Sequence, residues 1–135
     1  MFIFLLELNT KLMEEKAERL SRIVNDFLNN VENVGGIYVA SLDGLLVTHA
    51  SKMDIDPDRV AAMIASISAV GDRVSKELLN EESTHVIVQS HNGYVIIKKN
   101  GDLVFGVLVH GIDDSSMGLV MLEFEKLLNA IKDIK

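Results

Sequence analysis

Three segments of the chain carry apolar residues at the three-to-four-residue spacing of an amphipathic helix. The first runs from Met13 to Val34 and is predicted to end at Gly35-Gly36, because glycine readily adopts the left-handed conformation that closes helices. The second follows Asp56, a favoured N-cap residue, and runs from Pro57 to about Leu79. The third covers Met117 to Ile131.

Two segments between these helices predict strands joined by tight turns. Ile37 to Ala50 predicts a hairpin around Asp43-Gly44, a dipeptide that suits the right-handed twist of paired strands. Thr84 to Val109 predicts three strands joined at Asn92-Gly93 and Asn100-Gly101. The predicted order is therefore α-ββ-α-βββ-α. Because the strands are apolar on both faces, we expect helices to cover both sides of the sheet.

The two-residue turns also predict which residues face each other across each hairpin, since loop length fixes the register. The predicted pairs are Ala40 with Val47 and Tyr38 with His49 in the first hairpin, and His91 with Tyr94 in the second.

The second helix has two neighbouring faces of different character on a helical wheel. Large apolar residues form an arc that we expect to lie on the sheet: Val60, Met63, Ile64, Ile67, Val70, Val74 and Leu78. Mostly small residues form a stripe that we expect to face a second subunit: Ala61, Ala65, Ser68 and Asp72. Small side chains lower the steric limit on the approach of another helix, so this stripe is the predicted dimer contact.

Composition and charge narrow the class of protein. A chain of 135 residues fits one domain, and 48% hydrophobic with 24% charged residues indicates a packed globule rather than disorder. The absence of cysteine excludes disulfides, thiolate zinc sites and a cysteine nucleophile, and agrees with a cytoplasmic location. The formal net charge of −7 disfavours binding to nucleic-acid phosphates and to anionic membranes, so we expect neither partner.

Residues 1–12 precede the predicted domain, which we place at 13–135. The six apolar residues Met1 to Leu6 are too few to span a membrane, follow no Lys or Arg, and end at Glu7. Two interpretations remain open: a start-site extension with Met13 as the functional beginning, or an apolar arm. Because an exposed apolar patch is unfavourable in water, such an arm is expected either to pack on the domain or to promote self-association.

Few residues suggest catalysis, and we expect no catalytic residue, metal or cofactor. The histidines show no metal-ligand spacing; they are His49, His85, His91 and His110. Asp113 and Asp114 are interpreted as helix caps rather than a carboxylate pair, since two serines follow them. Neither a G-x-x-x-x-G-K-[ST] phosphate loop nor a G-x-S-x-G elbow occurs.

The element order and one segment together resemble the roadblock family, which includes dynein-associated light chains and bacterial and archaeal regulators of small GTPases. The segment is Gly36-Ile37-Tyr38-Val39-Ala40-Ser41-Leu42-Asp43-Gly44-Leu45-Leu46-Val47, and the match extends over Lys11 to Lys135. The resemblance implies a profilin-like α/β (α+β) fold of three α/β/α layers. In that fold a five-stranded antiparallel sheet carries the second helix on one face and the first and last helices on the other.

The resemblance further implies a non-enzymatic, dimeric regulator or scaffold that binds a Ras-like small GTPase through the surface around its second helix. A homodimer is expected, and its interface residues are predicted as Ala61, Ala65, Ser68 and Asp72 with Arg73 and Lys76 beside them. An alternative is a small-molecule sensor module of profilin-like architecture, with a ligand between helix and sheet. The uniformly apolar strands disfavour this alternative, because ligand sites usually add a few convergent polar groups.

Overall fold

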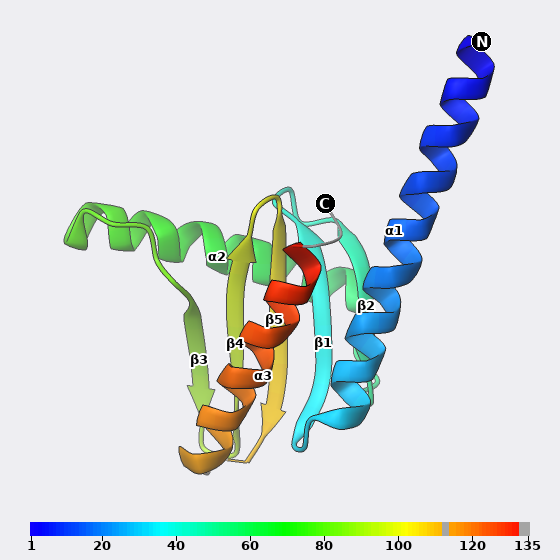
Figure 1. The fold of residues 1–135 in the computed structure, drawn as a ribbon. Helices are drawn as coiled ribbons and strands as arrows, with labels where there is room; N and C mark the ends of the chain where they lie inside the picture. The colour runs from blue at the N-terminus through cyan, green and yellow to red at the C-terminus, as the bar shows by residue number, and fades with distance from the viewer. Residues whose placement is uncertain (112–113, 133–135) are drawn as a thin grey trace.

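The computed structural model describes residues 1–111 and 114–132 of the chain, and its elements follow the predicted order (Figure 1). They are α1 (Phe2–Asn30), β1 (Val34–Ser41), β2 (Leu46–Ser51), α2 (Pro57–Leu79), β3 (Val86–Ser90), β4 (Gly93–Asn100), β5 (Leu103–His110) and α3 (Asp114–Lys132). The strands form one antiparallel sheet in the order β2-β1-β5-β4-β3. β1 therefore lies beside β5, which is the central strand of the sheet. β3 lies at one edge.

Helices cover both faces of the sheet, as predicted. α1 and α3 lie side by side on one face (Figure 1). The rings of Phe27 and Phe124 are in contact there, with their centroids 6.3 Å apart. Most of the buried side chains belong to this layer. α2 runs across the strands on the opposite face over a smaller core, which consists of Tyr38, Ala40, Ala61, Ile64, Ile97 and Val104.

α1 differs from its prediction at both ends. It begins at Phe2, so the predicted arm is a direct continuation of the helix without a break at Met13. It ends at Asn30 rather than at the glycine pair, which lies inside β1. Both glycines lie close to neighbouring side chains: a Cβ on Gly35 would lie 2.5 Å from Nε2 of His110, and one on Gly36 would lie 2.9 Å from the Tyr38 ring.

The first hairpin confirms one predicted pair and corrects the other. Tyr38 faces His49, and their rings stack with centroids 5.9 Å apart. Ala40, however, faces Leu46 instead of Val47, because the register shifts between Val39 and Ala40. An irregularity of this kind inserts an extra residue that turn chemistry alone does not predict.

The second hairpin turns one residue earlier than predicted. Ser90 faces Gly93, so the turn consists of His91 and Asn92, and the predicted pairing of His91 with Tyr94 is wrong. Gly93 is the first residue of β4, and a Cβ there would lie 2.6 Å from the carbonyl oxygen of Val109. The glycine of this Asn-Gly pair therefore serves close strand packing rather than the turn itself.

Candidate interaction surface around the second helix

The small residues of α2 face the sheet of their own chain. Ala61, Ser68 and Asp72 are buried, and only 6% of Ala65 is exposed. α2 lies close to β5 at a glycine, since a Cβ on Gly106 would come within 2.9 Å of Cγ2 of Ile64. Small side chains on the facing side of the helix permit this short distance. The prediction that this stripe faces a second subunit is therefore wrong: the stripe is covered within the subunit.

The large apolar residues of α2 lie mostly outside the core. Of the predicted arc only Ile64 is fully buried, while Val60 and Ile67 are half-buried. The remaining four are exposed and form a row along one side of the helix: Met63, Val70, Val74 and Leu78, at 54%, 59%, 51% and 76% of their surface. We call these four residues the apolar row. The prediction that the whole arc lies on the sheet is therefore wrong for these four residues.

The two basic residues predicted beside the interface are exposed, but they do not join the stripe. Nε of Arg73 lies 3.2 Å from Oε1 of Glu77, one helical turn away. Nζ of Lys76 lies 3.3 Å from Oε1 of Glu82, which follows the end of α2. Exposed pairs of this kind contribute little to stability, so both cations remain available to a partner.

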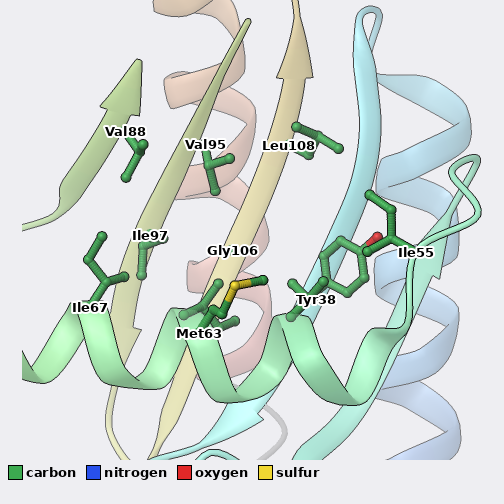
Figure 2. Close-up of a pocket in the computed structure, with 11 residues that line it drawn as sticks. Tyr38, Ile55, Met63, Ile67, Val88, Val95, Ile97, Gly106 and Leu108 are labelled. Carbon is green, nitrogen blue, oxygen red and sulfur yellow. The ribbon is translucent and has the colours of Figure 1, made fainter. Parts of the chain in front are cut away.

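An apolar groove of about 360 Å³ lies beside the apolar row, between α2 and the end of the sheet that α2 leaves uncovered (Figure 2). Its lining consists of Tyr38, Ile55, Val60, Met63, Ile64, Ile67, Val88, Val95, Ile97, Gly106 and Leu108. The Tyr38 hydroxyl donates a hydrogen bond to Oγ of Ser51 at 2.9 Å, so it is already occupied. The groove thus offers a surface for apolar side chains.

The edge strand β3 and the end of α2 extend this surface. The C-terminal half of α2 projects past β3, and the chain returns from its end to that strand (Figure 1). Ile87 and Val88 of β3 are exposed side chains at the sheet edge. An apolar edge strand favours pairing with another strand.

Asp72 anchors the projecting part of α2 to the sheet. Its carboxylate accepts hydrogen bonds from Nζ of Lys99 at 2.6 Å, from the backbone N–H of Ser83 at 3.2 Å and from the Ser83 hydroxyl. Burial raises the pKa of Asp72, but the hydrogen bonds from Lys99 and Ser83 and the charge of Lys99 outweigh it and lower the pKa below its usual value. Sequence reasoning placed this residue in an interface and missed its role inside the subunit.

Comparison with known proteins identifies the family. Residues 20–109, more than half of the chain, match the Roadblock/LC7 domain. The chain belongs to the roadblock/LC7 family. The predicted resemblance to the roadblock family and the predicted roadblock fold are therefore confirmed.

Solved structures agree with this roadblock fold. Myxococcus xanthus MglB superimposes with a TM-score of 0.77 at 16% identity, over 87% of this chain and 88% of that one. A Roadblock/LC7 domain from Streptomyces avermitilis gives 0.74 at 16% identity, over 84% and 94%. The gliding protein MglB from Thermus thermophilus gives 0.71 at 18% identity, over 88% and 90%. No curated protein matches the sequence.

The described part of the chain also bears on metal binding and on membrane spans. Within residues 1–111 and 114–132, no group of three or more His, Asp and Glu side chains is placed to hold a metal ion. Over the same residues, no helix is long and apolar enough to cross a membrane. The predicted cap at Asp113 lies outside the described residues.

Proposed function

We propose that this roadblock protein is a cytoplasmic homodimer that regulates or scaffolds a Ras-like small GTPase. The observation that carries the proposal is the apolar row on the projecting part of α2, beside an open β3 edge and an apolar groove. A projecting apolar element and an apolar recess on one subunit are the two complementary halves of an interface between identical copies.

The proposed dimer follows from a two-fold axis normal to the sheet beside β3. Antiparallel pairing of β3 with its copy joins the two sheets and removes both open edges. The same axis places the two α2 helices antiparallel on one face, so that each apolar row lies against the other subunit. The groove beside Met63 then receives side chains from the projecting helix of the second subunit.

The energetics of the exposed side chains support this arrangement. Burying a half-exposed Val, Leu or Met side chain contributes on the order of 1 kcal/mol, and the apolar row supplies four such side chains in each subunit. A dimer therefore gains several such contributions before strand pairing is added. Large exposed apolar patches on a soluble domain are typical of interaction sites rather than of free surface.

The outward side of the paired α2 helices is the proposed GTPase platform. Ala62, Ser66 and Ala69 are exposed there, with Arg59 and Arg73 at either end. Small side chains make a flat surface that another protein can approach closely, and the arginines can pair with carboxylates of a partner. The roadblock resemblance supports a Ras-like GTPase as that partner, since the family includes regulators of small GTPases. The groove lacks the convergent polar groups that a sensor of polar ligands needs.

Replacing Val74 by arginine is expected to give a folded monomer. The change puts a charge into the apolar row, where burial without a partner costs several kcal/mol, while the core of the subunit is untouched. Sedimentation equilibrium of the wild type and the variant measures the result. Ala69→Arg is the matched control: it adds the same side chain on the outward side of α2 and should stay dimeric. A dimeric Val74→Arg variant would refute this interface.

Capture of a partner tests the GTPase platform separately. Immobilised wild-type protein is expected to retain a Ras-like GTPase from the native cytoplasm, and Ala69→Arg should retain much less while remaining dimeric. Bound proteins are identified by mass spectrometry, and nucleotide dependence is checked by loading the lysate with GTP or GDP analogues. If Ala69→Arg captures the GTPase as well as the wild type does, the outward side of α2 is not the platform.

A further inference from the structure

The part of α1 that precedes Leu20 packs on nothing in its own subunit. All side chains of residues 1–19 are exposed, and this part of the helix projects beyond the sheet (Figure 1). We call residues 1–19 the helical arm. Most of the stability of a helix in a protein comes from the packing of one face rather than from intrinsic preference. A helical arm without packing is therefore expected to make a contact outside the subunit.

One methionine and three leucines form a seam along one side of the helical arm: Met1, Leu5, Leu8 and Leu12. Their spacing alternates between four and three residues, which is the pattern of a helix that packs against another helix. At about 100° per residue, the seam lies about 115° around the helix from the centre of the side that is buried in the subunit. Arg19 continues the line of the seam and is exposed, so the seam does not lead into the sheet.

We propose that the seam pairs with the seam of a second copy of the chain, and that the two helical arms run antiparallel. The symmetric register places Leu5 opposite Leu8 of the second copy, and Met1 opposite Leu12. The helices then overlap over residues 1–12, a length of about 18 Å. Both sheets have room in this arrangement, because each N-terminus lies opposite Leu12, about 12 Å along the helix before packing on the sheet begins at Leu20.

The surface beyond Leu12 has room for the end of the second helical arm. A hollow of about 370 Å³ lies there, and its lining consists of Leu12, Glu15, Lys16, Glu18, Arg19 and Arg22. In the proposed register the second copy's Met1, which is 99% exposed in the single subunit, reaches this hollow. Lys16 and Arg19 can lay their aliphatic stems over the methionine while their charged ends stay in water.

The N-terminus of α1 is also uncompensated within its own subunit. No side chain caps the helix, and its first turn contains no acidic residue to offset the positive end of the helix dipole. In the antiparallel pair, Glu15 lies about one turn beyond Leu12, beside the second copy's N-terminus. Among the ion pairs of residues 1–111 and 114–132, none involves Glu15. A parallel pair places the two positive N-termini side by side, so these charges favour the antiparallel direction.

The seam and the proposed α2 interface are separate surfaces. α1 lies over β2 and β1, whereas β3 is at the opposite edge of the sheet. Two separate symmetric contacts on one subunit join dimers into larger assemblies. Because the helical arms overlap over only about three turns, they pair more weakly than the α2 surfaces. The Val74→Arg variant is therefore a monomer at low micromolar concentration and pairs through the seam only at higher concentration.

Leu5→Glu is expected to abolish pairing of the helical arms, whereas Leu6→Glu is not. These neighbouring leucines are matched, since each has 50% of its surface exposed, but only Leu5 lies in the seam. Sedimentation of the wild type should show growth beyond the dimer as concentration rises, and Leu5→Glu should weaken that step roughly a hundredfold. If the α2 surfaces do not pair, Leu5→Glu should weaken a monomer–dimer step instead, so the two proposals are tested separately. Loss of the step in both variants, or in neither, overturns the seam.

Engineered cysteines test the direction of the helical arms, because the natural chain has no cysteine. A mixture of Leu5→Cys and Leu8→Cys proteins should form disulfides between the two variants, identified by peptide mapping. Leu12→Cys alone should not, because the register separates the two copies of residue 12 by about 16 Å along the helix. A Leu12→Cys disulfide, or no disulfide in the mixture, would refute the antiparallel pair. Wild-type protein that stays unpaired and sediments with phosphatidylcholine vesicles, dependent on both Leu5 and Leu6, would assign the helical arm to membranes.

Discussion

Replacing Ala65 by arginine is expected to unfold the subunit. Only 6% of Ala65 is exposed. It lies on the side of α2 that faces the turn between β1 and β2, where a Cβ on Gly44 would lie 3.8 Å from the Ala65 Cβ. An arginine at this position overfills the layer between helix and sheet and buries an unpaired charge. Each effect costs several kcal/mol, and together they match or exceed the usual stability of a small domain.

Thermal unfolding followed by circular dichroism measures this effect. Ala69→Arg is again the control, because it adds the same side chain one turn further along α2 on the exposed side and should leave the melting temperature within a few degrees of the wild type. A folded, monomeric Ala65→Arg protein with normal melting would mean that the small stripe faces a second subunit after all.

The wrong orientation of α2 shows what a helical wheel leaves out. On a helical wheel the face with the large apolar residues is taken to pack on the core of the same chain. In a helix that also forms an interface, large residues can serve the second contact, while small ones permit close approach to the sheet. Gly106, within an otherwise apolar strand, was the signal for such a close approach. Nothing in the sequence alone, however, places that glycine beneath Ile64.

The order of elements was predictable because each depends on local chemistry: helical spacing, the Asp56 cap that accepts from the N–H of Asp58, and turn dipeptides. Register was not fully predictable, because Gly93 was needed for contact with β5 and the turn shifted by one residue. Residues 1–12 were identified as apolar at their start, but the unbroken apolar run obscured the helix that continues from Met13 back to Phe2. Long-range packing, rather than local preference, decides these cases.

The exposure of residues 1–12 decides between the two behaviours that we expected of an apolar arm. Packing on the domain was one alternative and self-association the other. All side chains of Met1 to Arg19 are exposed in the subunit, so the first alternative is not what the structure shows. Self-association remains as a prediction for these residues.

Replacing Asp72 by alanine is expected to destabilise the subunit by about 3 kcal/mol. The change leaves the Ser83 N–H and hydroxyl and the Lys99 ammonium without the carboxylate that they share, and hydrogen bonds to a charged group are the costly ones to remove. Urea unfolding measures the loss. Arg73→Ala, the adjacent and exposed position, is the control and should change stability by no more than about 0.5 kcal/mol. Equal losses in both variants would contradict the anchor.

The same carboxylate predicts how stability depends on pH. Because the pKa of Asp72 is lower in the folded chain than its unfolded value of about 3.9, its contribution is fully present above that value and is lost as pH falls through the folded pKa. The pKa of Lys99 is raised, mainly by the hydrogen bond to Asp72, so its contribution is lost only in the alkaline range. Asp72→Asn removes the titrating group but keeps the shape. The stability difference between wild type and Asp72→Asn should therefore be constant near neutral pH and shrink on acidification below about pH 4, as measured by urea unfolding at each pH. A difference that stays constant down to about pH 2 would show that the anchor does not depend on the charge of Asp72.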